Sequence, residues 1–197
     1  MILNDASSAL SLLQTRRSGR PREMVGPGPD RDQLRQMLEI ASRIPDHGQL
    51  TPYRFVIIKP EQRPALEALY RRALAIADPD APTAKVDKAI ANANAAPCLV
   101  VLISSPIRDH KIPTFEQELT CGAAGMNLLN AATTLGFVGG WVTGWPAIDP
   151  TVTAAFCEAG ERIAGLIYIG RPGLPLEERA RPAFDTVASV WMPPQQD

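Results

Sequence analysis

Arginines near the start of the chain have the spacing of an anion-binding segment. Arg16, Arg17, Arg20 and Arg22 fall within QTRRSGRPRE, residues 14–23. Guanidinium groups present forked donors that match phosphate oxygens, and the hydroxyl of Ser18 adds a short neutral donor. Basic residues also favour a helix C-terminus, where they meet the negative end of the helix dipole. The segment is therefore either a phosphate site or an ordinary solvated helix end.

A second basic pair occurs close to the C-terminus. Arg179 and Arg181 lie in ERARPAF, residues 178–184. In an extended segment, residues two apart point the same way, so both guanidiniums could converge on one anion. The alternative is a solvated tail.

Two further segments have the composition of ligand-binding loops. In SRIPDHGQLTPYRFVI, residues 42–57, Arg43 and His47 flank a proline turn that leads into an apolar strand. Loops of this kind often hold ligands, although a polar turn is the simpler alternative. In GFVGGWVTGW, residues 136–145, glycines allow close backbone approach, and Trp141 and Trp145 supply large flat surfaces. Residues 136–145 lack the G-x-G-x-x-G spacing of a dinucleotide-binding loop, and the prolines of GPGPD, residues 26–30, remove the amide donors that such a loop needs. The chain also has no P-loop run.

Thiol and metal chemistry have less support. Cys121 has His110 and Glu118 nearby in sequence, but no spacing places the imidazole against the sulfur. A cysteine among small residues is more often a core residue. The two histidines, His47 and His110, lack the spacing of metal ligands, so we expect no metal site.

The charge balance argues against a general attraction to polyanions. Lys+Arg 20 against Asp+Glu 21 gives a net charge of -1, so any anion must be captured locally. The N-terminus lacks the pattern of a signal peptide, and no apolar run is long enough to span a bilayer. Three widely separated cysteines suit a reducing compartment. We expect a cytoplasmic protein that binds neither nucleic acid nor membrane.

The hydrophobic pattern predicts a single domain over residues 1–197, of mixed α/β or α+β type. The first helix should be capped by Asn4 or Asp5 and end near Thr15, and the second should begin with a capping box at Asp30 and Gln33. Further helices are expected near 66–74, 85–95, 114–135 and 150–159, and strands near 54–59, 98–105, 139–145 and 164–170. Gly136 should cap the long helix at its C-terminal end.

The expected helix over 114–135 has small residues in its middle. They are Gly122, Ala123, Ala124 and Gly125. Each glycine costs about 1 kcal/mol of helix propensity, which a helix tolerates where another backbone comes close. That backbone belongs either to the same chain or to a second copy across a dimer axis.

Taken in order, these segments resemble the FMN-dependent nitroreductase family, and most closely its small YdjA-like subgroup. The resemblance runs from Leu13 to about Val187 through RRSGR, RIPDHGQLTPYRFVII, GFVGGWVTG, GLIYIGRP and RARPAFDTV. It implies an α+β, nitroreductase-like fold with a mixed, mainly antiparallel central sheet flanked by helices. It also implies an intertwined homodimer with FMN sites at the subunit interface. The tail, from about 171 to 197, would then extend along the partner.

The resemblance implies roles for particular residues. Arg16, Arg17 and Ser18, with Arg20 as a further candidate, would hold the phosphate end of FMN, as would Arg179 and Arg181 in the tail. Arg43 and His47 match positions that reach the flavin bound mainly to the other subunit. The segment beside the cofactor would be Trp141, Val142 and Thr143. The chain departs from the family pattern at DHGQLTP, where an asparagine and a glutamine are common, and at Val142, where the subgroup has a basic residue.

The activity that the resemblance implies is ping-pong hydride transfer from NAD(P)H to tightly bound FMN and then to a nitroaromatic, quinone or similar small acceptor. No side chain need act as nucleophile or base, because the cofactor carries the redox chemistry. Two alternatives stay open: an FMN carrier or sensor without turnover, and fragmentation of the flavin by oxygen.

Overall fold

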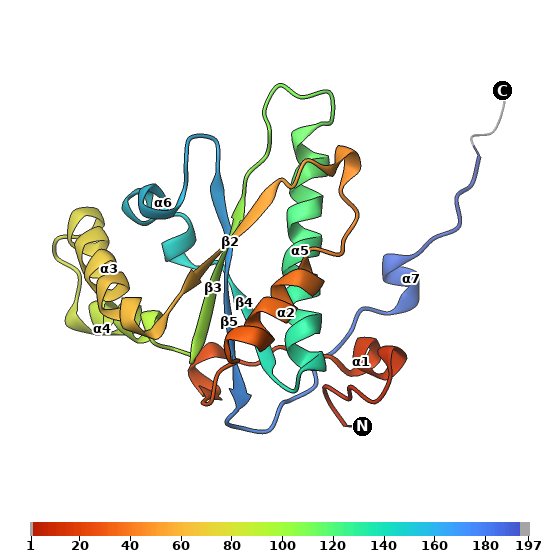
Figure 1. Cartoon of the computed structure of the whole chain (residues 1–197), viewed down its shortest axis with the longest axis horizontal. Coiled ribbons are helices and arrows are strands. Elements are labelled where there is room, and N and C mark those ends of the chain that lie inside the picture. The colour runs from red at the N-terminus through yellow and green to blue at the C-terminus, as the bar shows by residue number, and fades with distance from the viewer. Residues whose placement is uncertain (1, 194–197) are drawn as a thin grey trace.

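A five-stranded sheet lies at the centre of the computed structural model, which describes residues 2–193 (Figure 1). Its strands are β1 (Met24–Val25), β2 (Tyr53–Ile58), β3 (Cys98–Ser104), β4 (Val138–Val142) and β5 (Arg162–Pro172). β5 pairs with β1, β3 and β4, and β2 pairs with β3 at one edge. All pairs among the described strands are antiparallel, so the mainly antiparallel sheet is confirmed, and this part of the chain contributes no parallel pair.

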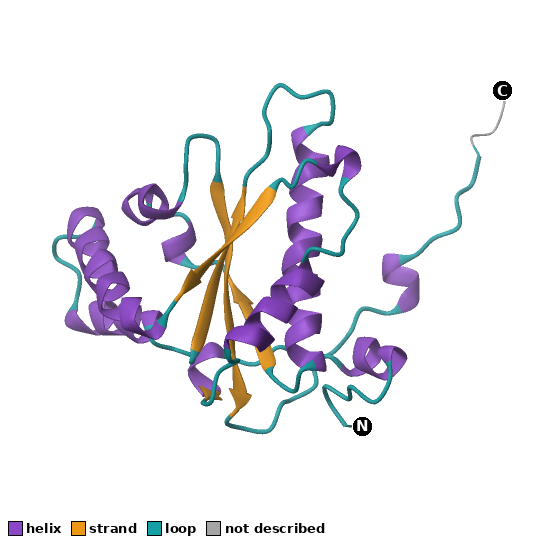
Figure 2. Ribbon diagram, in the orientation of Figure 1, coloured by secondary structure: helices purple, strands orange, loops and turns teal. Residues whose placement is uncertain are grey.

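Helices cover both faces of the sheet (Figure 2). One face packs against α2 (Arg31–Ala41) and α5 (Thr114–Thr134), and the other packs against α3 (Arg63–Ala77), α4 (Thr83–Ala93) and α6 (Pro150–Phe156). Two short helices, α1 (Ala9–Thr15) and α7 (Phe184–Val187), lie outside these layers, beyond α5 (Figure 1). Residues 188–193, which follow α7, lead away from the rest of the structure. Within the described residues, no helix has the length and apolar character needed to cross a membrane.

The inner strand β3, which lies between β2 and β5, contributes side chains to the core on both faces of the sheet. All of its residues are buried, as expected for an apolar strand covered on both faces. Because side chains alternate along a strand, Leu99, Val101 and Ile103 pack toward α3 and α6. Val100 and Leu102 pack toward α2 and α5. The two halves of the core hold the helices in fixed positions on either side of the sheet.

Hydrogen bonds at the helix ends confirm one predicted cap and correct another. The capping box between Asp30 and Gln33 is present at the start of α2. The cap of α1 is Ser8, whose Oγ accepts from the amide of Ser11, so the prediction of Asn4 or Asp5 was wrong. These two residues instead bond to the far end of the same helix, where Arg17 N donates to Asn4 Oδ1 and Asp5 N donates to the hydroxyl of Thr15.

The two glycines of α5 have different environments. A Cβ on Gly125 would lie 2.4 Å from Cζ3 of Trp141 and 2.8 Å from Cδ2 of Leu102. A Cβ on Gly122 would have no neighbouring atom within 4 Å. Close packing inside the chain therefore explains Gly125, whereas Gly122 lies on the open side of the helix.

The carboxylate of Glu161 joins three neighbouring strands where they end or begin. Its two oxygens accept from Arg54 of β2, from Nε at 2.8 Å and Nη2 at 2.5 Å. The hydroxyl of Ser105, just after β3, donates to the same carboxylate at 2.5 Å, and the amide of Glu158 donates at 2.8 Å. These donors, the Arg54 side chain above all, lower the pKa of Glu161 to about 2. The contacts fix the loop between α6 and β5 on the sheet.

Candidate cofactor-binding site

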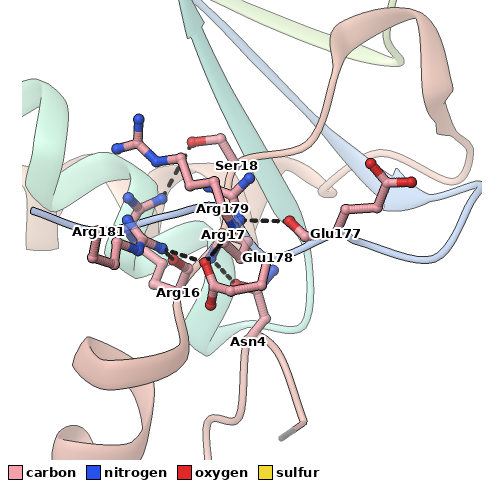
Figure 3. A network of polar contacts seen from close by, with 8 residues as sticks. All are labelled: Asn4, Arg16, Arg17, Ser18, Glu177, Glu178, Arg179 and Arg181. Atoms are coloured by element: carbon pink, nitrogen blue, oxygen red, sulfur yellow. Dashed lines mark hydrogen bonds and ion pairs between the residues drawn. The ribbon is translucent and has the colours of Figure 1, made fainter.

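The structure brings the two arginine segments together, although they lie at opposite ends of the chain (Figure 3). Nε of Arg17 donates to the backbone carbonyl of Glu177 at 2.7 Å. Nη2 of Arg181 lies 3.5 Å from the carbonyl oxygen of Arg16. We call Arg16, Arg17, Arg179 and Arg181 the arginine cluster. A single site therefore has donors from both segments.

Close backbone contacts hold the first segment in place. The amide of Gly19 donates to the carbonyl of Gly139 in β4 at 3.2 Å. A Cβ on Gly140 would lie only 2.6 Å from the Gly19 carbonyl oxygen, and one on Gly19 would lie 2.8 Å from a methyl group of Val138. The glycines of GFVGGWVTGW thus let the RRSGR segment lie directly on β4. On the other side, the amide of Gly173 donates to the carbonyl of Glu23 and sets the path of the tail.

The arginine cluster carries more positive charge than its carboxylates neutralise. Glu178 is the acid in contact with it, 3.0 Å from Nη2 of Arg181 and 3.5 Å from Nε of Arg17. Arg16 and Arg179 make no ion pair within residues 2–193. Burial, followed by the charges of Arg181, Arg17 and Arg179, lowers the pKa of Arg16. Such a group of like charges favours the binding of an anion.

A cavity of about 480 Å³ opens beside the arginine cluster. Arg17, Ser18, Arg20 and residues 174–179 contribute to its walls. The hydroxyl of Ser18 accepts from Nη1 of Arg16 at 3.3 Å, so serine and arginine are close enough to contact one ligand. Arg20 is paired with Glu23 at 3.0 Å and stands at the margin of this site.

A smaller cavity, of about 310 Å³, lies next to the first and shares Arg20 as a wall. Val142, Thr143, Gly144 and Tyr168 also line it. Val142 and Thr143 are exposed there, as a segment beside a ligand requires.

The side chain of Trp141 packs against the core and does not face the small cavity. The indole lies against α5 and β5, where a Cβ on Gly165 would approach its nitrogen to 1.9 Å. That nitrogen donates to the carbonyl of Ala164 at 3.1 Å. The indole therefore belongs to the core on the α5 side, and the small cavity is lined by the residues that follow Trp141. The alternation of side chains along β4 separates Trp141 from Val142 in this way.

His47 lies apart from the arginine cluster, whereas Arg43 lies beside the C-terminal half of α5, where its carbonyl oxygen accepts from Nδ2 of Asn127 at 3.3 Å. Nδ1 of His47 lies 2.7 Å from Oε1 of Glu116, in the first turn of α5. The arginine cluster lies near the other end of this helix, which is about 30 Å long at 1.5 Å per residue. One chain therefore does not bring all the predicted site residues together.

The loop that carries His47 has an unusual backbone. Gly48, Gln49 and Thr51 all have positive φ, at 73°, 54° and 49°. Such conformations persist where surrounding contacts fix them, and they cluster at functional sites. Here the carboxylate of Asp46 accepts from the amides of Leu50 and Thr51 and holds the turn.

Three contributors to the site were missing from the sequence-based prediction. Glu178 contacts the arginines through its carboxylate, Glu177 through its carbonyl, and Asn4 through its side chain (Figure 3). An acid within ERAR could have been noticed as a counter-ion. A backbone carbonyl has no sequence signal, because every residue has one.

Cys121 has the properties of a core residue. Its side chain is buried, burial raises the pKa of its thiol to about 11, and the sulfur lies 3.8 Å from the carbonyl of Ile103. Nδ1 of His110 accepts from the amide of Ile112 instead of meeting the sulfur. The structure therefore gives no support to thiol catalysis.

In the described part of the chain, no group of three or more His, Cys, Asp or Glu side chains could hold a metal ion.

Comparisons with known proteins agree with this architecture. The family model described as "Nitroreductase family" matches residues 13–171. The Escherichia coli protein named "Putative NAD(P)H nitroreductase YdjA" is 34% identical over 167 residues, which are 84% of this chain and 89% of that protein.

Two solved structures show the same fold. The nitroreductase-like family protein from Bacillus cereus has a TM-score of 0.80 at 20% identity, covering 93% of this chain and 96% of that chain. A mutant of NfnB, described as an FMN and NADPH-dependent nitroreductase from Sphigopyxis sp. strain HMH, has a TM-score of 0.70 at 18% identity, covering 93% and 98%. The family model and the identity to YdjA extend over most of the sequence, so the chain belongs to the nitroreductase family.

Proposed function

We propose that this chain is an FMN-dependent NAD(P)H oxidoreductase that reduces a nitroaromatic, a quinone or a similar small acceptor. The observation that carries the proposal is the convergence of both arginine segments on one cavity in a chain of this family. The names of YdjA and NfnB support NAD(P)H as the reductant, and the description of NfnB supports FMN as the cofactor.

The donors around the larger cavity fit a phosphate group. Arg17, Ser18 and Arg179 line this cavity and would bind phosphate oxygens through hydrogen bonds, and Arg16 and Arg181 contact the same two segments closely enough to contribute. A phosphate dianion would also balance the surplus positive charge of the arginine cluster. Arg20 separates this cavity from the smaller one, so a ligand held here by its phosphate could extend along Val142 and Thr143.

Bound FMN would supply the redox chemistry, accepting a hydride from NAD(P)H and passing it to the second substrate. The chain's own residues would bind and orient the cofactor. Val142 and Thr143 would form the wall beside the ring, and no side chain among them has the acid–base character of a catalytic group. Specificity for the acceptor would then depend on the shape of the smaller cavity and on residues that a second subunit adds.

We also propose a homodimer, because His47 contacts the first turn of α5, about a helix length from the arginine cluster. Each subunit would contribute Arg43 and His47 to the cofactor bound mainly by its partner. One side of α5 has the apolar surface that such contact requires: Phe115, Leu119 and Met126 are exposed around the open Gly122, at spacings of one helical turn. The tail adds Phe184, Val187, Val190 and Trp191, all exposed.

The dimer is tested by Leu119→Glu. A charge in the middle of the apolar surface of α5 should convert a dimer to a monomer at micromolar concentration, measured by sedimentation velocity. Arg35→Glu, on an exposed face of α2, serves as a control and should leave the dimer intact. A wild-type chain that sediments as a monomer would contradict the proposed assembly.

We place the protein in the cytoplasm because its three cysteines are free, which suits a reducing compartment.

The proposed activity is tested by the absorption spectrum of the purified protein. We expect a yellow protein whose flavin band is bleached by anaerobic NADH or NADPH and restored by a nitroaromatic or a quinone, with steady turnover. A yellow protein that no nicotinamide bleaches would instead be an FMN carrier or sensor. Consumption of the flavin on exposure to oxygen would indicate fragmentation.

A further inference from the structure

We propose that Glu178 is an internal anion of the arginine cluster, which occupies the cluster when no phosphate is bound and so limits the affinity for FMN. This inference rests on the proposed function, because it assumes that the cluster receives the cofactor phosphate. Glu178 would then be a specificity residue, because its charge would determine how much more tightly the site binds FMN than a flavin without the phosphate.

Glu178 occupies a central position among the arginines (Figure 3). Its Oε1 accepts from Nη2 of Arg181 at 3.0 Å and from the amide of Arg179 at 2.8 Å. The same oxygen lies 3.5 Å from Nε of Arg17. One carboxylate oxygen therefore contacts donors on three of the four residues that would bind a phosphate.

The carboxylate carries a negative charge at neutral pH. The hydrogen bond from the Arg179 amide, with the charges of Arg181 and Arg17, lowers the pKa of Glu178. A phosphate placed among the same arginines would therefore meet a like charge at short range. Either Glu178 rotates away, which breaks its hydrogen bonds, or it stays and repels the phosphate; both reduce the affinity.

The side chain has room to leave the cluster. It is 43% exposed, and it lies in the extended segment between β5 and α7. Rotation of this side chain into solvent requires no movement of the core. Glu178 is thus placed to exchange with an incoming phosphate.

The neighbouring Glu177 provides a matched control. Its carboxylate is 84% exposed and lies 4.0 Å from Nη2 of Arg20, pointing away from the arginine cluster (Figure 3). Its contact with Arg17 is made by the backbone carbonyl, which a side-chain substitution leaves in place. Glu177→Gln and Glu178→Gln therefore remove the same charge from adjacent positions, and only the second removes it from the cluster.

The experiment compares the FMN-free forms of wild type, Glu178→Gln and Glu177→Gln. FMN and riboflavin, which lacks the phosphate, are titrated against each, and the dissociation constant is read from flavin fluorescence. Glu178→Gln should bind FMN about tenfold more tightly, since one like charge at contact distance is removed. Riboflavin binding should stay unchanged in all three proteins, and Glu177→Gln should bind FMN within about twofold of wild type.

Thermal unfolding of the FMN-free proteins provides a second measurement. Without its internal anion, Glu178→Gln should unfold about 2 °C lower than wild type, and inorganic phosphate should stabilise it more than it stabilises wild type. Unchanged or weaker FMN binding by Glu178→Gln would overturn the proposal, as would an equal gain for riboflavin. If wild type binds neither flavin, the proposed function fails, and the inorganic phosphate comparison alone decides the role of Glu178.

Discussion

Replacement of Arg16 or Arg181 by alanine is expected to weaken FMN binding by about 10- to 100-fold, the loss that follows removal of a charge-assisted hydrogen bond. Arg16 sits within the cluster with a guanidinium that makes no ion pair in the described structure, so a phosphate would be its main counter-ion. Arg181 brings the tail to the same site. Fluorescence titration of FMN against each FMN-free variant measures the effect.

The control for this prediction is Arg72→Ala. Arg72 is exposed on α3, which packs on the other face of the sheet from α5, and it lines neither of the two cavities of the candidate site. Its loss should leave FMN affinity within about twofold, because solvent and salt screen exposed charges. If neither Arg16→Ala nor Arg181→Ala loosens the cofactor more than Arg72→Ala does, the phosphate is bound elsewhere.

Replacement of Glu161 by glutamine is expected to lower the free energy of unfolding by about 1–2 kcal/mol at neutral pH. The shift of the Glu161 pKa from 4.5 to about 2 corresponds to an upper limit of about 3 kcal/mol at 1.36 kcal/mol per unit. Solvent screening reduces this value, because 38% of the Arg54 side chain is exposed, although only 11% of the Glu161 side chain is. Urea unfolding of both proteins measures the difference.

The same substitution should change how stability depends on pH. The folded pKa lies below the unfolded one, so the contribution of Glu161 is complete above about pH 4.5 and is lost as the pH falls toward 2. The gap between wild type and Glu161→Gln should therefore narrow over that range. Glu158→Gln is the control, because Glu158 is exposed and contributes to the network through its amide. A constant gap between pH 7 and pH 3 would contradict the assigned pKa.

The arrangement of the arginine cluster links the cofactor to the tail. Residues 177–181 reach the RRSGR segment only because the chain turns after β5 and passes Glu23. The same tail carries the exposed apolar residues that we assign to the dimer. Binding of the phosphate would therefore fix the segment that precedes the partner contact, so cofactor binding and assembly would stabilise each other.

The sequence predicted most of the elements that hold the site. The capping box at Asp30, the apolar run of β3 and the glycine after α5 each depend on neighbours within a few positions, which a sequence displays directly. The cap of α1 was predicted wrongly, because Asn4 and Asp5 bond to residues near the far end of that helix. Local patterns do not distinguish a cap from such a contact. The strand expected near 139–145 was predicted too long, since β4 ends at Val142 and Trp145 begins a short 3-10 helix.

The sequence names candidate site residues where chemistry alone marks them. Arginines spaced for one anion, glycines that admit a backbone, and the order of the motifs all follow from residue type and position. What only the tertiary structure decided is which groups meet. It joined Arg17 to the carbonyl of Glu177, placed Glu178 among the arginines, turned Trp141 into the core and set His47 at the opposite end of α5. These contacts depend on how strands and helices pack over long sequence separations, and no short stretch of sequence contains that information.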